Sequence, residues 1–469
     1  MTGTDFLQLD PADAPTSGMA TWLSGAVREA IADGRLAVGA PLPSTRVLAE
    51  QLGVSRGVVV DAYQRLVDEG LLAGRRGAGT TVQARPLREP AGAPRRAAAP
   101  ARVVADLSPG LPDLSAFPRA AWARAERTAL AEASSADLGY GDPRGMTALR
   151  EALAGWLART RGIRAHPDEV LVVAGVSQAL ALLAKVLTER GVTRIGFEDP
   201  GSRGARIHLE RWGLQPVRVP VDADGLDVGA LARTGVDAVL VTPAHQFPTG
   251  TVLGPDRRRA LVDWARAEQG RLVLEDDYDA EHRYDRPPVA AMHGLAPDRV
   301  VHLGSVSKSL APAIRLGWLL APEPLHRELV EARYWLDLAS PSLPQLALAH
   351  LITSGAFERH LRLVRARHRE RRDALLAALA EHLPQAEVHG VAAGLHLLVT
   401  LPDAVDDVAV VERARDVGIV VHALSSHRTG DGPAGFVLGY AATPAGRMRQ
   451  AVATIASLVR QLTVSESQS

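Results

Sequence analysis

The sequence predicts a chain of two domains, a small helical domain followed by a large α/β domain with a mostly parallel sheet. Three observations indicate this organisation. The 469 residues are too many for one hydrophobic core. A stretch made almost entirely of Ala, Pro, Arg and Gly divides the chain at residues 84–104. After this stretch, short apolar runs alternate with amphipathic segments, which is typical of strands covered by helices.

Composition narrows the possible functions. Lys plus Arg and Asp plus Glu both number 53, so any nucleic-acid binding must come from a local patch rather than from net charge. The absence of cysteine excludes disulfides and thiolate metal sites, and we assign no metal ligands. The acidic N-terminus is not a signal peptide, and no apolar run reaches the roughly 18 residues of a membrane span. We therefore expect a cytoplasmic protein without membrane contact.

Residues 19–83 predict three short helices. Leu23, Val27 and Ile31 recur every four residues, as on one face of an amphipathic helix. Ser44 can cap a second helix and Ser55 a third, and the turn between them contains a glycine. The positions expected to face the core from the second and third helices are Val47, Leu48, Leu52, Val59, Ala62, Leu66 and Val67.

A β-hairpin is expected after the third helix. Gly70 fits the left-handed position that ends a helix, and LLAGRRGAGTTVQA gives two short extended pieces around a glycine-rich tip. Helix, helix-turn-helix and wing in this order indicate a domain that binds a double-stranded DNA operator rather than a generic helical subdomain. The domain carries seven arginines and six acidic residues, a net charge of only +1, which favours a dimer that contacts two half-sites.

This segment resembles the winged helix of the GntR family of bacterial regulators. The resemblance lies in LPSTRVLAEQLGVSRGVVVDAYQRLVDEGLL and in GAGTTV. It implies that the helix starting at Ser55 enters the major groove while the wing contacts phosphates or base edges. The residues that it implicates in DNA binding are Ser44, Thr45, Arg46, Ser55, Arg56, Gly57, Arg75, Arg76, Gly79 and Thr80.

The segment 84–104 is expected to be a linker. It holds five arginines and one glutamate and no apolar periodicity. A solvated tether is the simplest interpretation, and a basic segment lying along a phosphate backbone is the alternative.

The large domain is expected to form its ligand site at one edge of a sheet. The apolar runs are VLVVAG (170–175), RIGFEDP (194–200), AVLVTP (238–243), RLVLEDD (271–277) and VVHLGS (300–305). Each run ends in a short segment that is polar or contains glycine. Ligands of open α/β sheets bind outside the carboxyl ends of the strands, so these segments are expected to meet in one cleft.

The short polar segments that follow the strands contain the functional groups that a pyridoxal 5′-phosphate (PLP) site requires. Gly175 opens a loop before a helix, where backbone N–H groups can hold a phosphate. The word EDDYD brings carboxylates and Tyr278, and SVSK brings two hydroxyls and the amine of Lys308, one of only two lysines in the chain. PLP has an aldehyde for a lysine, a ring nitrogen for a carboxylate, and a phosphate for hydroxyls and for Arg315.

Residues from about 106 to 462 resemble a fold-type I aminotransferase, and the whole chain resembles a MocR-type regulator. The matching words are YGDPRG (140–145), EDPG (198–201), TPAHQFPTG (242–250), EDDYDAEHRY (275–284) and SVSKSLAPAIRLG (305–317). The resemblance implies an α/β PLP-dependent transferase fold over residues 105–465, with a smaller C-terminal α+β subdomain. It also implies a homodimer.

The resemblance implies a role for each matching residue. Lys308 matches the lysine that forms the Schiff base with PLP, which arginine cannot do because guanidinium stays protonated. Asp276, with Asp277 as the alternative, matches the carboxylate paired with the ring nitrogen, and Tyr278 matches the donor to the ring oxygen. Tyr140 matches the tyrosine that reaches the phosphate across the dimer. The positions implied to hold the phosphate are Gly175, Val176, Ser177, Ser305, Ser307 and Arg315.

Three positions depart from the pattern of catalytic aminotransferases. Ser202 stands where related regulators carry an aromatic residue on the PLP ring, and Phe247 replaces the Asn of Asn-Pro-Thr-Gly. Val437 stands where the enzymes have the arginine that clamps the substrate carboxylate, with Arg428 as a candidate substitute. Loss of that clamp argues against efficient transamination. For Asp277, Glu281 and Arg283, a structural ion-pair network is expected rather than catalysis.

We therefore expect a PLP-dependent transcription regulator that senses a small molecule, either PLP itself, which would link it to vitamin B6 metabolism, or an amino acid or amine. One alternative is a working aminotransferase with an accessory DNA-binding module. Another is a GntR-type repressor whose large domain only dimerises. The sequence leaves open the effector, the operator, the regulated genes and the sign of regulation.

Overall fold

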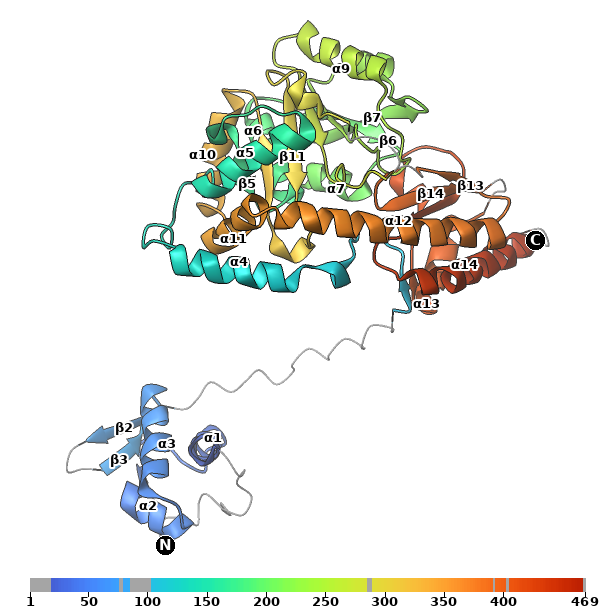
Figure 1. Ribbon diagram of the computed structural model, residues 1–469. Coiled ribbons are helices and arrows are strands. Elements are labelled where there is room, and N and C mark those ends of the chain that lie inside the picture. Colours follow the sequence, from blue (N-terminus) through green and yellow to red (C-terminus); the bar gives the residue numbers. More distant parts are fainter. Residues whose placement is uncertain are drawn as a thin grey trace. The chain divides into compact units, whose positions relative to one another are not determined.

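The computed structural model describes residues 18–75, 79–84, 103–284, 289–390, 393–401 and 405–466. The chain divides into two compact units, residues 1–100 and residues 101–469, which Figure 1 shows in blue and in cyan to red. Most of the expected linker, and Arg76 of the expected wing, lie outside the described residues, and only the backbone of Arg75 is described.

The first unit is a three-helix domain with a small antiparallel sheet of order β1-β3-β2. Its elements are α1 (Met19–Ala32), β1 (Pro41–Leu42), α2 (Thr45–Leu52), α3 (Arg56–Asp68), β2 (Leu72–Arg75) and β3 (Gly79–Val82). Ser44 Oγ accepts a hydrogen bond from Val47 N–H at the start of α2, and Gly53 ends that helix in the left-handed conformation. Leu23, Val27 and Ile31 are buried in the core as expected.

Two expectations for this unit were wrong in detail. The side chain of Val47 is 44% exposed rather than in the core, because it lies in the first turn of α2 on the face away from α1 and α3. Ser55 precedes α3 in an extended conformation, but its hydroxyl accepts no hydrogen bond from the helix. That hydroxyl is therefore exposed and available to a ligand.

The second unit is built on an eight-stranded mixed sheet of order β5-β12-β11-β10-β9-β6-β7-β8. The strands are β5 (Leu171–Val173), β6 (Arg194–Asp199), β7 (Gln215–Asp222), β8 (Gly225–Leu226), β9 (Ala238–Val241), β10 (Leu272–Asp276), β11 (Val300–Ser305) and β12 (Gly317–Leu320). The central neighbours β11, β10, β9, β6 and β7 are parallel, whereas β12 and β8 pair antiparallel. The five runs expected as strands are thus β5, β6, β9, β10 and β11.

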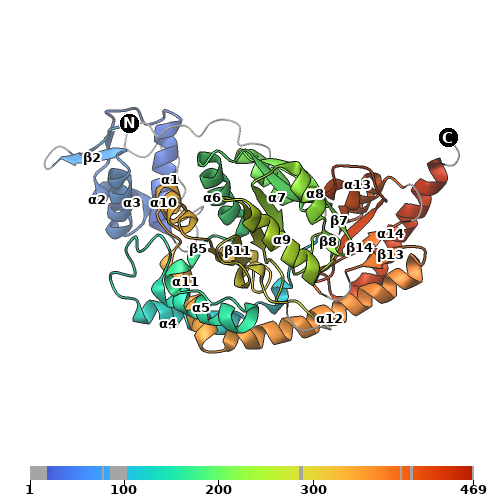
Figure 2. The same ribbon diagram turned by 90° about the horizontal axis from the view of Figure 1, so that it is seen from above.

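Helices cover both faces of this sheet (Figures 1 and 2). Leu272 and Leu274 of β10 pack on the side of α6, whereas Val273 between them packs on the side of α9. This alternation is the ordinary period of a strand that is buried on both faces. The helices are α4 (Arg119–Glu132), α5 (Thr147–Arg161), α6 (Val176–Glu189), α7 (Arg203–Arg211), α8 (Val228–Thr234), α9 (Pro255–Ala267), α10 (Leu325–Asp337) and α11 (Ser342–Thr353).

A smaller α+β part completes the unit. The long helix α12 (Ala356–His382) runs from α11 to α14 (Ala445–Glu466) in Figure 1. A four-stranded antiparallel sheet of order β13-β14-β17-β16 packs with them, and its members are β13 (Glu387–His389), β14 (His396–Thr400), β16 (His422–Ala423) and β17 (Gly435–Gly439). Between these elements lie α13 (Asp407–Asp416) and β15 (Ile419–Val420), which pairs in parallel with β4 (Ala105–Asp106).

Among the described residues, no helix is both long enough and apolar enough to cross a membrane.

Candidate functional site

A cavity of about 530 Å³ opens at the carboxyl ends of β9, β10 and β11 and at the start of α6. Its position agrees with the rule for ligand sites in open α/β sheets. Eight of the ten cofactor-binding residues expected from the sequence line it, and a ninth, Gly175, directly precedes the lining residue Val176. The residues that line it are Pro109, Gly110, Val176, Ser177, Leu180, Ser202, Gly204, Ala205, His208, Thr242, Phe247, Asp276, Tyr278, Ser305, Ser307, Lys308, Pro312, Arg315, His422 and His427.

Lys308 follows β11 and brings an amine into this cavity. Burial lowers the pKa of Lys308, although the charges of Asp276 and Asp279 oppose this effect. Gly110 lies against the amine, because a Cβ built on this glycine would sit 3.0 Å from Lys308 Nζ. A buried lysine with a lowered pKa loses its proton more readily, and the neutral amine is the form that attacks an aldehyde.

Asp276 ends β10 and supplies the carboxylate of the cavity. Burial, together with the charges of Asp277 and Asp279, raises the pKa of Asp276 to about 7. Its Oδ1 atom is buried and has no hydrogen-bond partner. A buried polar atom without a partner is costly, so this oxygen is suited to a donor supplied by a ligand.

Asp277, the alternative to Asp276, points to the opposite face of the sheet. Its carboxylate accepts two hydrogen bonds from Arg161, at 2.6 Å from Nε and 2.7 Å from Nη2, and both side chains are 3% exposed. Arg161 also donates to the carbonyl of Val289 at 2.7 Å. Asp277 is therefore part of a structural ion pair, which is the arrangement that the sequence led us to expect for it.

The other end of the cavity has the donors of a phosphate site. Gly175 directly precedes α6, and the first residues of that helix, Val176 and Ser177, line the cavity. Ser305 Oγ lies 2.8 Å from Ser307 Oγ. Arg315 reaches the same region and forms no ion pair with any residue that the structure describes. A helix N-terminus, two hydroxyls and a guanidinium form a suitable set of donors for an anion.

The three departures from the aminotransferase pattern have structural explanations. Ser202 caps α7, since its Oγ accepts a hydrogen bond from Ala205 N–H at 3.3 Å. Phe247 packs edge-on against Tyr278, with ring centroids 6.4 Å apart. Val437 is fully buried in β17 in a small apolar cluster with Leu398 and Leu424, so it offers no charge to a ligand.

Arg428 does not replace the missing clamp in this structure. Its guanidinium donates to the carbonyls of Gly432, at 2.6 Å, and of Pro433, and it does not line the cavity. Arg315 is therefore the sole guanidinium in the cavity wall among the described residues. An amino acid bound beside a phosphate would find no second guanidinium there.

Sequence reasoning missed several residues of the cavity wall. Gly110 precedes the large sheet and Thr242 follows β9, while His422 and His427 come from the C-terminal part. The two imidazoles stack with centroids 5.5 Å apart and planes 10° apart, and burial lowers the pKa of His427 to about 4. Thr242 could have been found, because it lies in the matched segment TPAHQFPTG. His422 and His427 could not, because a single histidine outside any motif does not indicate a ligand site.

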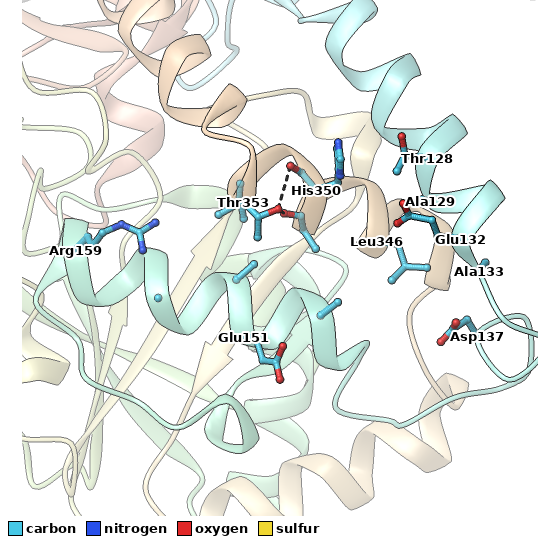
Figure 3. A pocket seen from close by; sticks show the side chains of 15 residues that line it. Thr128, Ala129, Glu132, Ala133, Asp137, Glu151, Arg159, Leu346, His350 and Thr353 are labelled. Atoms are coloured by element: carbon cyan, nitrogen blue, oxygen red, sulfur yellow. Dashed lines mark hydrogen bonds between the residues drawn. The ribbon is translucent and has the colours of Figure 1, made fainter.

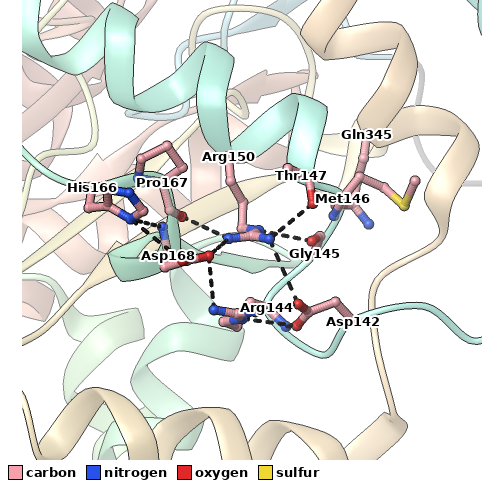
Figure 4. A network of polar contacts seen from close by, with 10 residues as sticks. All are labelled: Asp142, Arg144, Gly145, Met146, Thr147, Arg150, His166, Pro167, Asp168 and Gln345. Carbon is pink, nitrogen blue, oxygen red and sulfur yellow. Dashed lines mark hydrogen bonds and ion pairs between the residues drawn. The ribbon is translucent and has the colours of Figure 1, made fainter.

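Tyr140 does not line the cavity, and its side chain is 83% exposed. The YGDPRG word that contains it is held by a polar network shown in Figure 4. Buried Arg150 donates to Gly145 O at 3.1 Å and to Asp168 Oδ1 at 2.7 Å, and Arg144 bridges Asp168 and Asp142. The network therefore fixes the loop while leaving the tyrosine free for contact outside its own subunit.

A larger hollow, of about 850 Å³, lies between α4, α5 and α11 (Figure 3). Its wall is mainly small residues, with Glu132, Asp137, Glu151, Arg159 and His350 around it. It contains neither the lysine nor a converging set of donors, and one of its two threonines, Thr353, already donates its hydroxyl hydrogen to the carbonyl of Ala349 in its own helix. The smaller cavity, which contains Lys308, Asp276 and Arg315, is therefore the candidate site despite its lower volume.

In the first unit, the expected DNA-binding residues gather around the starts of α2 and α3. Ser44, Arg46, Ser55, Arg56 and Gly57 are exposed, and Thr45 is half-buried. Arg56 Nε lies 3.4 Å from Thr45 Oγ1, so the two helix starts are in contact. Gly79 and Thr80 of β3 are exposed and half-buried, respectively. This surface has the donors for phosphates and base edges.

Comparison with known proteins identifies both units. Residues 23–82 match the profile of the bacterial regulatory proteins of the gntR family, and residues 103–455 match that of the class I and II aminotransferases. The chain belongs to the MocR-type regulators of the gntR family. These are helix-turn-helix transcription regulators with an aminotransferase-like domain, and the aminotransferase class I and II fold implies dependence on PLP.

Individual relatives agree with this assignment. The chain is 36% identical to the HTH-type pyridoxine biosynthesis transcriptional regulator PdxR of Corynebacterium glutamicum over 95% of its own length and 96% of the relative. It is 33% identical to the probable rhizopine catabolism regulatory protein MocR of Rhizobium meliloti, over 92% of each chain. An archaeal alanine:glyoxylate aminotransferase shares the fold with a TM-score of 0.71 at 24% identity, covering 76% of this chain and 91% of that one.

The residues of the cavity fit PLP. The partnerless Oδ1 of Asp276 suits the N–H of a protonated ring nitrogen, and the amine of Lys308 forms no hydrogen bond or ion pair with any described residue. The glycine at position 110 leaves the space next to that amine open.

Proposed function

We propose that this protein is a DNA-binding transcription regulator whose effector is PLP itself. The observation that carries the proposal is a cavity equipped for the cofactor alone. It contains Lys308, Asp276 and one guanidinium, that of Arg315. The position of a substrate clamp is occupied by buried Val437. A sensor of PLP needs only the cofactor pocket, whereas a sensor of an amino acid must also hold an α-carboxylate.

Each residue has a definite task in this proposal. When bound, PLP supplies an aldehyde that can attach to a lysine amine. Lys308, with its pKa lowered by burial, presents that amine. Asp276 accepts the hydrogen of the ring nitrogen, and Tyr278 donates to the ring oxygen. The phosphate is held by Ser305, Ser307, Arg315 and the start of α6 at Gly175, Val176 and Ser177.

The regulated process that we propose is vitamin B6 synthesis or salvage. The relative PdxR is named for regulation of pyridoxine biosynthesis, and the match to it extends over almost the whole of both chains. Ser202 in place of a stacking aromatic residue supports reversible retention of PLP, since stacking of aromatic rings stabilises a complex. Occupancy would then follow the concentration of free PLP.

The DNA-binding unit is proposed to act as a pair within a homodimer. The exposed Arg46 and Arg56 are its candidate contacts to base edges or phosphates. Tyr140 is exposed, as expected of a residue that reaches the phosphate of the partner subunit. Two half-sites would compensate for the small net charge of each unit.

The decisive experiment is a titration of the protein's own upstream DNA with PLP-free and PLP-loaded protein. Linkage requires that PLP change operator affinity by the factor by which the operator changes PLP affinity, typically about 5- to 150-fold. Lys308→Ala serves as the control and should respond weakly or not at all. Equal affinities with and without PLP, followed by a clear change on addition of an amino acid or amine, would refute PLP as the effector.

A further inference from the structure

A buried hydrogen-bonded pair lies beside Tyr278 and takes no part in the proposed function. His245 Nδ1 lies 2.8 Å from Asp279 Oδ2 and 3.2 Å from the Tyr278 hydroxyl. Both His245 and Asp279 are 2% exposed. His245 comes from the loop after β9 and Asp279 from the segment after β10, so the pair joins the ends of two neighbouring strands.

A metal ion does not explain this arrangement. His396 brings a third ligand-type atom within 4.8 Å of the other two. The 2.8 Å between His245 and Asp279 is a hydrogen-bond distance, however, whereas two ligands on one tetrahedral zinc ion lie about 3.3 Å apart. His396 instead packs on the ring of His245, with centroids 5.0 Å apart.

The protonation of the pair follows from Asp279. Burial opposes ionisation of Asp279, but the charge and hydrogen bond of His245 hold its pKa below the usual value. An ionised carboxylate only accepts hydrogen bonds, so His245 Nδ1 must carry the hydrogen in either charge state of the ring. Nδ1 therefore cannot accept a hydrogen from Tyr278.

Tyr278 is left with its own hydrogen to donate elsewhere. Burial and the charge of Asp279 raise the pKa of Tyr278 well above its usual value, so the hydroxyl stays protonated. One acceptor within reach is the Asp279 carboxylate, whose Oδ2 is already engaged by His245 at 2.8 Å. The others are the His245 carbonyl oxygen, at a long 3.3 Å, and any group in the cavity that Tyr278 lines. The ionisable groups that act on the hydroxyl or on the pair are Asp276, Asp279, Glu198, His245, His282 and His396.

We propose that the Asp279–His245 pair is a positioning pair that fixes Tyr278 as a hydrogen-bond donor into the cavity, toward the ring oxygen of the ligand. Packing maintains the orientation of the imidazole, because a Cβ built on Gly394 would overlap the ring of His245. The inference rests on the proposed function, since it takes PLP as the ligand that offers the ring oxygen. It adds two residues that contact Tyr278 rather than PLP.

The test is the pH midpoint of the visible absorbance change of PLP-loaded protein. In Asp279→Asn, no carboxylate holds the hydrogen on Nδ1, so the tautomer with its hydrogen on Nε2 can form; the free lone pair of Nδ1 then accepts the Tyr278 hydrogen and draws it away from the cavity. The ring oxygen then loses its donor and becomes more basic. We expect Asp279→Asn and Tyr278→Phe each to raise the midpoint by about one pH unit. The double variant should show no larger shift than Tyr278→Phe alone.

Two substitutions at His245 provide matched controls and decide the matter if Asp279→Asn does not fold. In His245→Asn, the amide nitrogen takes the position of Nδ1 and keeps the donor, so the midpoint should stay at the wild-type value. His245→Gln removes that donor, leaves the Asp279 carboxylate to compete for the Tyr278 hydrogen, and should raise the midpoint.

The outcomes separate the two proposals. A normal PLP band in the wild type with an unshifted midpoint in Asp279→Asn, or shifts that add in the double variant, would overturn the positioning role alone. Equal midpoints for His245→Asn and His245→Gln would do the same. Failure of the wild-type protein to develop any PLP band would overturn the proposed function and this inference with it.

Discussion

Asp276 ends β10 and Asp277 directly follows it, and because one faces the cavity and the other the interior, their asparagine variants should separate binding from stability. Asp276 carries the carboxylate of the cavity, with a pKa raised to about 7 from 3.8. Asp277 holds Arg161 through two hydrogen bonds in the interior. Substitution by asparagine removes one negative charge in each case and hardly changes the volume of the side chain.

The expected changes in the free energy of unfolding follow from these two environments. A carboxyl with a raised pKa destabilises the folded state increasingly as the pH rises from about 4 to about 7, because the unfolded chain releases that proton earlier. About 3 pH units correspond to at most about 4 kcal/mol at pH 8, and less because one side of Asp276 faces the cavity. PLP-free Asp276→Asn should therefore be more stable than the wild type by about 2–4 kcal/mol at pH 8 and much less at pH 5. Asp277→Asn should be less stable by about 3–5 kcal/mol, because it leaves the Arg161 charge buried without its partner.

The assay combines denaturant unfolding of the PLP-free large unit at pH 5 and pH 8 with PLP titration followed by absorbance. Asp276→Asn should bind PLP about 10- to 100-fold more weakly, since a hydrogen bond to a charged group is lost. Folded Asp277→Asn should bind PLP as the wild type does. Weak PLP binding by Asp277→Asn with normal binding by Asp276→Asn would refute the assignment, and an Asp276→Asn variant no more stable than the wild type at pH 8 would refute the electrostatic reasoning.

Three further predictions concern DNA binding, the YGDPRG loop and turnover. Arg56→Ala should weaken operator binding and, if Arg56 contacts one phosphate, reduce the slope of log affinity against log salt concentration by about 0.9. Arg28→Ala is the control, because it removes an ion pair with Glu69 and should leave the slope unchanged. Equal slopes in both variants would contradict the placement of α3. Gly145→Ala should cost on the order of 2–4 kcal/mol in unfolding experiments, because φ is +103° and its Cβ would lie 2.6 Å from Val172 Cβ. Gly141→Ala, with positive φ but open space, should cost only about 1 kcal/mol, and equal losses would show that the clash is unimportant. Aminotransferase turnover with common amino acids should stay far below the roughly 1 per second of ordinary enzymes, and a steady-state assay at that rate would restore the enzyme hypothesis.

The outline of the fold and of the cavity could be read from the sequence because both depend on local patterns. The runs that contain β9, β10 and β11 are apolar and are followed directly by polar words, and the rule for parallel strands brings those words together. The helix-turn-helix could be predicted for the same reason, since Ser44 caps the start of α2 and Gly53 ends it in the left-handed conformation.

The predictions that failed, and the residues that were missed, depend on contacts between segments that are far apart in the sequence. The inward assignment of Val47 failed because periodicity alone cannot tell which face of a short helix meets its neighbours. Arg161 and Asp277 are 116 residues apart, and His245 and Asp279 are 34 apart, so no local spacing links them. The alternation of β10 does place Asp276 and Asp277 on opposite faces, but it does not say which face holds the cavity.

The parallel pairing of β4 with β15 has a mechanical consequence. Ala105 and Asp106 are clamped beside Ile419 and Val420, and the chain then runs directly to Gly110, against the amine of Lys308. Gly439 N–H fastens the carbonyl of Leu107 on the way, at 2.7 Å. The segment that leaves the large unit toward the DNA-binding unit is therefore continuous with one wall of the cavity over a handful of residues. A ligand that displaces this wall would therefore act within a few residues of the point where the described large unit begins.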